Sequence, residues 1–146
     1  MADVFDPTKR SQIMARIRSS GTKPENRLYQ MVRAILGGRR RIVRNVRDIP
    51  GKPDLFIPSL GLAIFLDGCF YHGCPIHGHI PKSNGAYWAP KIARTIGRDS
   101  SNARRLRRMG YRVWRFWEHA VEGRKAIATA AILQRRLKKL LVENGS

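Results

Sequence analysis

Both cysteines of the chain and three of its four histidines lie in one short stretch, GCFYHGCPIHGH, which covers residues 68–79. The fourth histidine, His119, lies much farther along the chain in the segment FWEHA. Thiolate sulfur and imidazole nitrogen are the ligands of tetrahedral Zn²⁺ in structural sites. Closely spaced cysteines beside histidines, in a chain that we expect to stay in a reducing compartment, favour metal binding over a disulfide.

Two aspartates bound neighbouring apolar segments of the chain. Asp54 opens PDLFIP and Asp67 closes LAIFLD, and the turn PSLG joins these segments into an expected hairpin. The two carboxylates should therefore emerge near the same end of the hairpin. Carboxylate oxygens are ligands for Mg²⁺, which can activate water for attack on a phosphodiester. The alternative is that strand-terminal aspartates only begin turns, and it stays open for Asp67 in particular.

The chain is strongly basic, with 29 Lys and Arg against 10 Asp and Glu among 146 residues, a net charge of +19. The basic residues are spread over the whole sequence, so the natural partner is a polyanion. On charge alone, an architectural or ribosomal protein that coats nucleic acid fits as well as an enzyme does. Membrane binding is disfavoured, and the N-terminal segment MADVFDPTKR lacks the apolar stretch of a secretory signal, so we expect a soluble, unexported protein.

Hydrophobic periodicity predicts alternating elements in a single domain. The expected helices cover residues 7–21, 22–38, 86–110 and 121–143, and the expected strands cover residues 40–46, 53–58, 62–67 and 111–117. This order predicts an α/β fold with a mixed β-sheet flanked by helices. The last strand follows a long helix, so it can return parallel to its neighbour through a right-handed crossover.

Five separated blocks of the sequence recur in order in a known family. They are MADVFDPTKRSQIMARIRSSGTKPE, PGKPDLFIP, IFLDGCFYHGCPIHG, YWAPKIARTIGRD and RVWRFWEHA. With these blocks, residues 1 to about 125 resemble the very-short-patch repair endonucleases, the DNA mismatch nucleases of bacteria. The resemblance implies a restriction-endonuclease-like core with a structural Zn²⁺. It also implies Mg²⁺-dependent nicking of double-stranded DNA on the 5′ side of the thymine in a T:G mismatch.

The same resemblance implies how the chain is organised and where it works. Residues 1–146 would form one endonuclease domain, with an N-terminal DNA-contacting helical segment (1–21), a catalytic core (22–120) and a closing C-terminal helix (121–146). The protein would be a monomer in the bacterial cytoplasm, associated with the nucleoid and with mismatch-repair proteins as further partners.

Four residues correspond to active-site positions of the family. The resemblance makes Asp54 the central Mg²⁺ ligand and His72 a catalytic histidine, and it makes Asp99 and Glu25 supporting acids. Glu25 also fits a capping box with Thr22 at the start of the second helix, and both roles can coexist.

Cys69, His72 and Cys74 bring three nitrogen or sulfur ligands close together, and His119 supplies a fourth. In the family's best-known pattern the fourth ligand is a cysteine in WEC, where this chain has His119 in WEH. That pattern also has a longer histidine run in the loop, so two assignments stay open here. If His72 binds zinc, His77 or His79 supplies the catalytic imidazole, and if His72 is catalytic, His77 is the zinc ligand.

Aromatic residues stand beside these ligands. Phe70 and Tyr71 lie in the loop and Trp88 begins the following helix. Flat apolar side chains can insert between base pairs, and the family uses such a group beside the mismatch. For Trp88 a place in the core is an equal alternative.

A second hypothesis is a zinc-stabilised DNA-binding or nuclease-like protein of another lesion or restriction specificity. Asp54 and Asp99 favour the enzyme, because a binding module in so basic a chain has no evident use for a strand-end aspartate. Leu66 and Asp67 replace a Thr-His pair of the best-known family member, so the role of Asp67 stays open.

Overall fold

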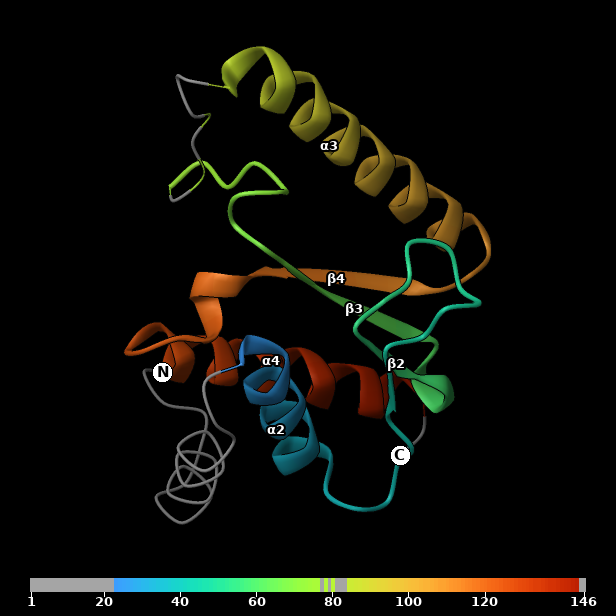
Figure 1. Ribbon diagram of the computed structural model, residues 1–146. Helices are drawn as coiled ribbons and strands as arrows, with labels where there is room; N and C mark the ends of the chain where they lie inside the picture. Colours follow the sequence, from blue (N-terminus) through green and yellow to red (C-terminus); the bar gives the residue numbers. More distant parts are fainter. Residues whose placement is uncertain (1–22, 77, 79, 81–83, 145–146) are drawn as a thin grey trace. The chain divides into compact units, whose positions relative to one another are not determined.

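A computed structural model of the protein describes residues 23–76, 78, 80 and 84–144. The helix predicted at residues 7–21 lies outside the described residues. The elements in chain order are α2 (Pro24–Leu36), β1 (Val43–Arg44), β2 (Leu55–Ile57), η1 (Pro58–Leu60), β3 (Leu62–Asp67), α3 (Gly85–Arg108), β4 (Arg112–Trp117), η3 (Glu118–Val121) and α4 (Lys125–Glu143) (Figure 1). They form two compact units, one of which contains Arg44–Phe56 and Gly61–Glu118, while the other contains Ile57–Leu60 together with the described residues up to Val43 and from His119 onward.

The strands form a mixed four-stranded sheet in the order β1-β2-β3-β4. β3 and β4 are parallel and in register from Leu62 opposite Arg112 to Asp67 opposite Trp117. The long helix α3 connects these two strands, as the sequence predicted for a crossover (Figure 1). The predicted α/β class with a mixed sheet and helices is therefore confirmed.

One apolar cluster joins α3 to the sheet. Ala63 and Phe65 alternate along β3 and so share a face of the strand, and they pack with Val113 of β4 and with Ala103 and Leu106 of α3. Leu106 is completely buried, so its replacement by Ala would cost about 2–5 kcal/mol of stability. The cluster fixes which side of α3 faces the two strands.

The other unit contains α2 and α4, which pack on each other through apolar stripes at helical spacing. The buried residues of these stripes include Leu28, Met31 and Val32 of α2 and Leu133, Leu137 and Leu140 of α4. The Thr129 hydroxyl donates a 2.6 Å hydrogen bond to the Ala120 carbonyl, which ties α4 to the turn before it.

Three predicted boundaries were wrong. The first strand shrinks to Val43–Arg44, because Asn45 has a φ of 52° and leaves the extended region. α2 begins at Pro24 with Lys23 as its N-cap, one residue later than predicted, and the Lys23 side chain makes no capping hydrogen bond; Thr22 lies outside the described residues. The last helix begins at Lys125, because Glu118–Val121 form a 3₁₀ turn and Gly123 takes a φ of 55°. In the part of the chain that the structure describes, none of the helices combines the length and apolarity that crossing a membrane requires.

Candidate active site

Asp67, His72 and Asp99 form a compact group, in which one ligand atom from each lies within 4.8 Å of the others. His72 Nδ1 lies 2.5 Å from Asp99 Oδ2 and 3.7 Å from Asp67 Oδ1. An ionised carboxylate can only accept, so Nδ1 bears the proton of this hydrogen bond and the lone pair of the neutral ring is at Nε2. The group therefore presents an oriented imidazole that can take up a proton.

Each member of this group comes from an element whose position the core fixes. Asp67 is the last residue of β3 and is only 7% exposed. Asp99 interrupts an otherwise apolar stripe of α3 made by Ile92, Ile96, Ala103 and Leu106. The core cluster buries the Ala103–Leu106 part of that stripe, so it turns the Asp99 carboxylate toward the end of β3.

His72 lies in the loop that follows β3. Its backbone N–H donates to the Gly68 carbonyl at 3.2 Å. Gly73, with a φ of 70°, lies so close to α3 that a Cβ atom there would be 2.7 Å from Ile96 Cδ1. The missing side chain lets the loop pack on α3, which places the His72 ring beside Asp99.

Arg115 of β4 completes the group and was not identified from the sequence. Its Nε and Nη2 each donate a 2.9 Å hydrogen bond to one oxygen of Asp67, and Nη2 also lies 3.4 Å from Asp99 Oδ1. The available signal was an arginine in the middle of the aromatic strand YRVWRFW. A cavity of about 310 Å³ opens beside these side chains, and its lining also includes Ile96, Ser100, Ala103 and Arg107.

Asp54 lies immediately before β2 and reaches the end of β3. Its Oδ2 accepts a 2.7 Å hydrogen bond from the backbone N–H of Leu66, the residue before Asp67. Left-handed backbone at Gly51 and Lys52, with φ of 80° and 54°, forms the turn that brings the chain into β2. Asp54 and Asp67 thus lie at the same end of the hairpin, although the group around His72 does not include the Asp54 carboxylate.

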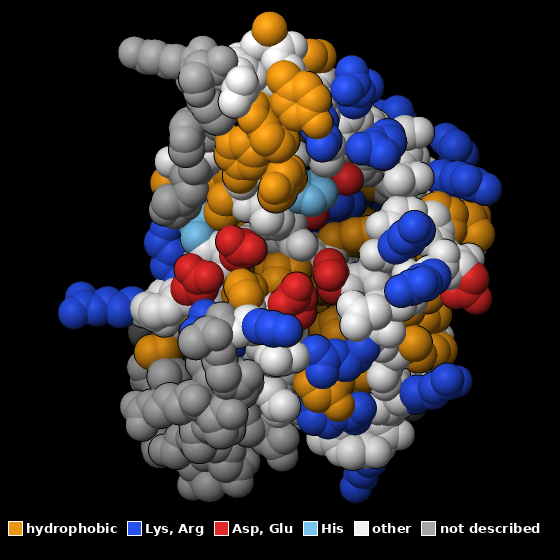
Figure 2. Space-filling view, viewed as in Figure 1, with side chains coloured by type: hydrophobic (Ala, Val, Ile, Leu, Met, Phe, Trp, Pro, Cys, Tyr) orange, Lys and Arg blue, Asp and Glu red, His pale blue; other side chains and the backbone are white. Residues whose placement is uncertain are grey.

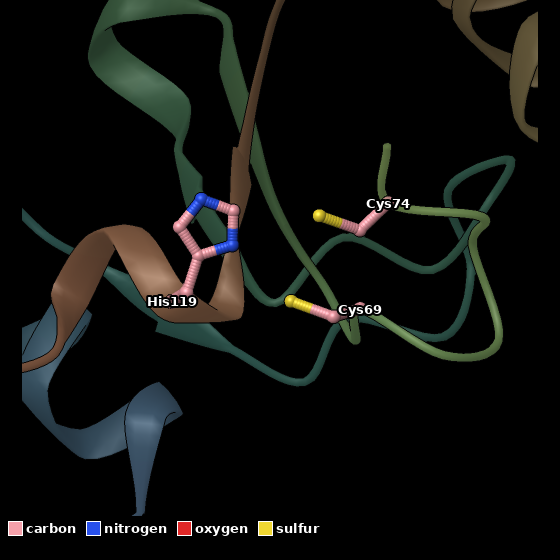
Figure 3. Close-up of side chains that lie close together, drawn as sticks. All are labelled: Cys69, Cys74 and His119. Carbon is pink, nitrogen blue, oxygen red and sulfur yellow. The ribbon is translucent and has the colours of Figure 1, made fainter. Parts of the chain in front are cut away.

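Cys69, Cys74 and His119 form a second group with ligand atoms within 4.8 Å of one another (Figure 3). The Cys74 N–H donates a 2.9 Å hydrogen bond to the Cys69 carbonyl, so the loop curls and brings the two thiols to the same side. His119 is the second residue of the 3₁₀ turn η3, which directly follows β4. Two sulfurs and one imidazole nitrogen match the donor set of a structural zinc site, and His77 and His79 lie outside the described residues.

His72 is not part of the thiol group. The described geometry places its ring among the carboxylates, which corresponds to the catalytic one of the two assignments that the sequence left open. Glu25 is exposed in the first turn of α2, in the other unit, and belongs to neither group.

The predicted aromatic residues come together on the surface. The Phe70 ring lies 5.1 Å from that of Tyr71 and 5.0 Å from that of Trp88, both edge to face. Tyr87, which the sequence reading missed although it adjoins Trp88, lies 5.0 Å from the Trp88 ring. Tyr71 and Tyr87 are 55% and 59% exposed. Lys91 Nζ lies 5.3 Å from the centre of the Trp88 ring.

Figure 2 shows hydrophobic side chains gathered on the surface over the loop after β3 and the start of α3, with Lys and Arg side chains nearby on α3. Large exposed apolar patches that are rimmed by polar or charged residues often mark sites where another molecule binds. We call Phe70, Tyr71, Tyr87 and Trp88 the aromatic cluster.

Known proteins are similar to this chain in sequence. Residues 2–77 match the family described as DNA mismatch endonuclease Vsr. The DNA mismatch endonuclease Vsr of Escherichia coli strain K12 is 34% identical over 153 aligned positions, covering 100% of this chain and 92% of that protein. The Type II nicking enzyme V.NmeAIP of Neisseria meningitidis is 36% identical and covers 98% of this chain and 96% of its own length. The Type II nicking enzyme V.NaeI of Lentzea aerocolonigenes is 42% identical over 75% of this chain and 68% of its own. With a match over more than half of its length and relatives that align along almost all of it, this chain belongs to the Vsr family of DNA mismatch endonucleases.

Proposed function

We propose that this protein nicks double-stranded DNA on the 5′ side of the thymine in a T:G mismatch, with Mg²⁺ as its catalytic ion. The observation that carries the proposal is the pairing of His72 Nδ1 with Asp99 at the end of β3, the strand end that Asp54 also reaches. A base with a fixed lone pair beside a carboxylate that can hold a hard cation is what hydrolysis of a phosphodiester requires.

Asp54 is the residue that would hold the magnesium ion. Its carboxylate supplies the oxygen donor that Mg²⁺ prefers, and the hydrogen bond from Leu66 N–H keeps the group at the end of β3. When bound, the ion would lower the pKa of water and neutralise charge on the phosphate. His72, oriented by Asp99, would accept the proton of the attacking water at Nε2. For Glu25, which lies outside this group in the first turn of α2, the role of a supporting acid rests on the family resemblance alone.

Cys69, Cys74 and His119 would hold a structural zinc, with His77 as the fourth ligand. Their soft donor set fits zinc and does not fit magnesium. A zinc there would cross-link the loop after β3 to the end of β4. That cross-link would hold both His72 and the aromatic residues Phe70 and Tyr71 in place.

The aromatic cluster would insert beside the mismatched pair. The edge-to-face contacts with Trp88 support Phe70 and Tyr71 from one side and leave Tyr71 largely exposed. A mismatch lowers the cost of unstacking, so insertion favours damaged over intact DNA.

The proposal extends to the organisation of the chain. The described core would be of the restriction-endonuclease type, within a single monomeric domain of residues 1–146. Residues 1–21 would contact DNA, and 121–146 would close the fold. The protein would act in the bacterial cytoplasm, beside other mismatch-repair proteins.

A second candidate is a nicking enzyme with another sequence or lesion specificity. Several relatives are named as Type II nicking enzymes, which favours differences in recognised sequence within the family.

A nicking assay tests both candidates. The substrates are end-labelled duplexes with one T:G pair in several flanking sequences, and the controls are the same duplexes with T:A or C:G at that position. We expect Mg²⁺-dependent nicking 5′ of the thymine in at least one context and none in the controls or in EDTA. Nicking of the perfectly paired controls at the same rate would contradict mismatch specificity.

A further inference from the structure

Arg115 places a fixed positive charge inside the carboxylate group. In the parallel register of β3 and β4, Arg115 lies opposite Phe65, and its guanidinium carbon sits 4.2 Å from the centre of the Phe65 ring. In this stacked position, Arg115 Nε and Nη2 each donate a hydrogen bond to one oxygen of Asp67, which makes a bidentate pair. The side chain is 24% exposed, and Nη1 is buried without a hydrogen-bond partner in the described part of the chain.

The same guanidinium serves a second carboxylate. Nη2 lies 3.4 Å from Asp99 Oδ1, while the other oxygen, Oδ2, accepts from His72 Nδ1. One oxygen of Asp99 thus faces the arginine and the other faces the imidazole. This arrangement leaves the Asp99 carboxylate little freedom to rotate away from His72.

The charges explain why an arginine is needed here. The carboxylates of Asp67 and Asp99 would by themselves repel each other, and together with His72 they would form a ligand set for a divalent ion. An arginine stays charged at any physiological pH, and its planar fork matches a carboxylate better than lysine does. The bidentate contact occupies both oxygens of Asp67, which a metal ion would otherwise use.

We propose that Arg115 is a positioning residue of this site, standing between Asp67 and Asp99 where a second cation would otherwise bind, and holding Asp99 against His72. The catalytic consequence rests on the proposed function, because it requires His72 to act on the DNA. The exclusion of a divalent ion does not rest on it.

Titration with Mn²⁺ followed by electron paramagnetic resonance tests the exclusion without DNA. We expect Arg115→Met to bind one more Mn²⁺ per chain than the parent protein. The extra ion should disappear in the double variant Asp67→Asn/Arg115→Met. The matched control, Arg112→Met, removes an exposed arginine from the same strand and should bind as the parent does. An unchanged Mn²⁺ count in Arg115→Met would overturn the exclusion.

Single-turnover nicking of a T:G duplex at saturating protein tests the positioning role. Supporting residues around a catalytic group are worth about 10- to 100-fold, so Arg115→Met should lose about that factor in rate. The Kd for the duplex should shift no more than in Arg112→Met, since each loses one positive charge. Arg115→Lys should recover part of the rate, because lysine returns the charge without the fork. Parent-like nicking by Arg115→Met would refute the role.

Two outcomes remain to be separated. Circular dichroism shows whether Arg115→Met is folded. If it is not, the nicking rate is compared in two other variants, Arg115→Lys and the charge-balanced Asp67→Asn/Arg115→Met. Nicking at the parent rate in both would refute the positioning role. If the parent nicks no T:G duplex, the proposed function fails, while the Mn²⁺ count still decides whether Arg115 excludes an ion.

Discussion

At the scale of single residues, the two histidine environments separate two kinds of chemistry. His72 contacts hard carboxylates, whereas His119 lies with two thiols. The first surroundings suit proton transfer, because a hydrogen bond to Asp99 fixes the tautomer of the ring. The second suit a closed structural metal site. Replacing His72 should therefore lower nicking and spare zinc binding, whereas replacing a residue of the thiol group should remove zinc and, through the loop that zinc would hold, lower nicking as well.

Asp54→Ala should abolish nicking while DNA binding persists. The substitution removes the carboxylate proposed to hold Mg²⁺ and leaves the basic surface and the aromatic cluster unchanged. Gel shifts with a T:G duplex in Ca²⁺ should give a Kd within about tenfold of the parent, a difference of about 1.4 kcal/mol. Nicking in Mg²⁺ should fall to background. A variant that nicks at the parent rate would show that Asp54 only forms the turn before β2.

His72→Ala should lose nicking but retain zinc. Its imidazole hydrogen-bonds to Asp99 and takes no part in the thiol group, so loss of the ring removes the base and spares the metal ligands. The measurements are the nicking rate and the zinc content of protein purified without chelators. Loss of zinc together with activity would instead assign His72 to the metal.

At the scale of elements, the loop between β3 and α3 is the part of the chain on which the proposed function depends most. Within a few residues it contributes Cys69, Phe70, Tyr71, His72 and Cys74. Such a loop has little apolar core of its own, so the proposed zinc and the packing of Gly73 on Ile96 must hold it. The elements on either side of it, β3 and α3, pack together through one buried cluster.

Cys74→Ser should lower both zinc content and stability. The purified parent should contain about one tightly held zinc per chain, since a site with four nitrogen and sulfur ligands binds one ion. Loss of a structural metal should reduce the free energy of unfolding by more than about 2 kcal/mol, measured by urea denaturation. His79→Ala serves as the control, since the sequence assigns it no ligand role in this arrangement. A parent free of zinc would contradict the proposed site.

Tyr71→Ala should weaken binding to mismatched DNA more than binding to matched DNA. Only the mismatched complex is expected to use insertion, and loss of stacking costs about 1–3 kcal/mol per base. The control is Met109→Ala, which removes a side chain of similar exposure, 54%, outside the aromatic cluster. Fluorescence anisotropy on both duplexes measures the two affinities. Equal losses on both would indicate that Tyr71 only packs against Phe70 and Trp88.

At the scale of the whole molecule, a net charge of +19 supplies affinity for DNA without selecting a sequence. Phosphate contacts position a protein on the duplex, and selection of a DNA site comes from side chains that contact the bases or insert between them. The chain has only 10 Asp and Glu against 29 Lys and Arg. In the candidate site, Asp67 pairs with Arg115 and Asp99 with His72, so these two carboxylates are engaged locally.

Arg104→Ala should weaken binding to matched and mismatched DNA alike. Arg104 is exposed on α3, and removing one phosphate contact should make the slope of log K against log salt shallower by about 0.9. Ser101→Ala, a neutral exposed change on the same helix, is the control. The measurement is a salt titration of binding to both duplexes. A loss confined to the mismatched duplex would place Arg104 in recognition of the lesion.

The sequence alone determined the family, the α/β class and the approximate positions of α2, α3, β3 and β4, because strong periodicity and five ordered motif blocks depend only on local order along the chain. It also identified the ligand types in the loop after β3. It could not assign His72, since its spacing to Cys74 is compatible with zinc and its place after Tyr71 is compatible with catalysis.

Only the tertiary structure decided which side chains meet. Asp99 reaches His72 because the apolar stripe of α3 packs on β3 and β4, and the parallel register sets Arg115 beside Phe65 and Asp67. These residues are far apart in sequence, so no local pattern encodes their distances. The shortened first strand also depends on residues that are distant in sequence. Asn45 takes a left-handed φ, which ends the strand, and its N–H donates a hydrogen bond to the Asp54 carbonyl. The residue types determine which ligands and catalytic groups the chain contains, and the packing of distant segments determines which of these side chains come into contact.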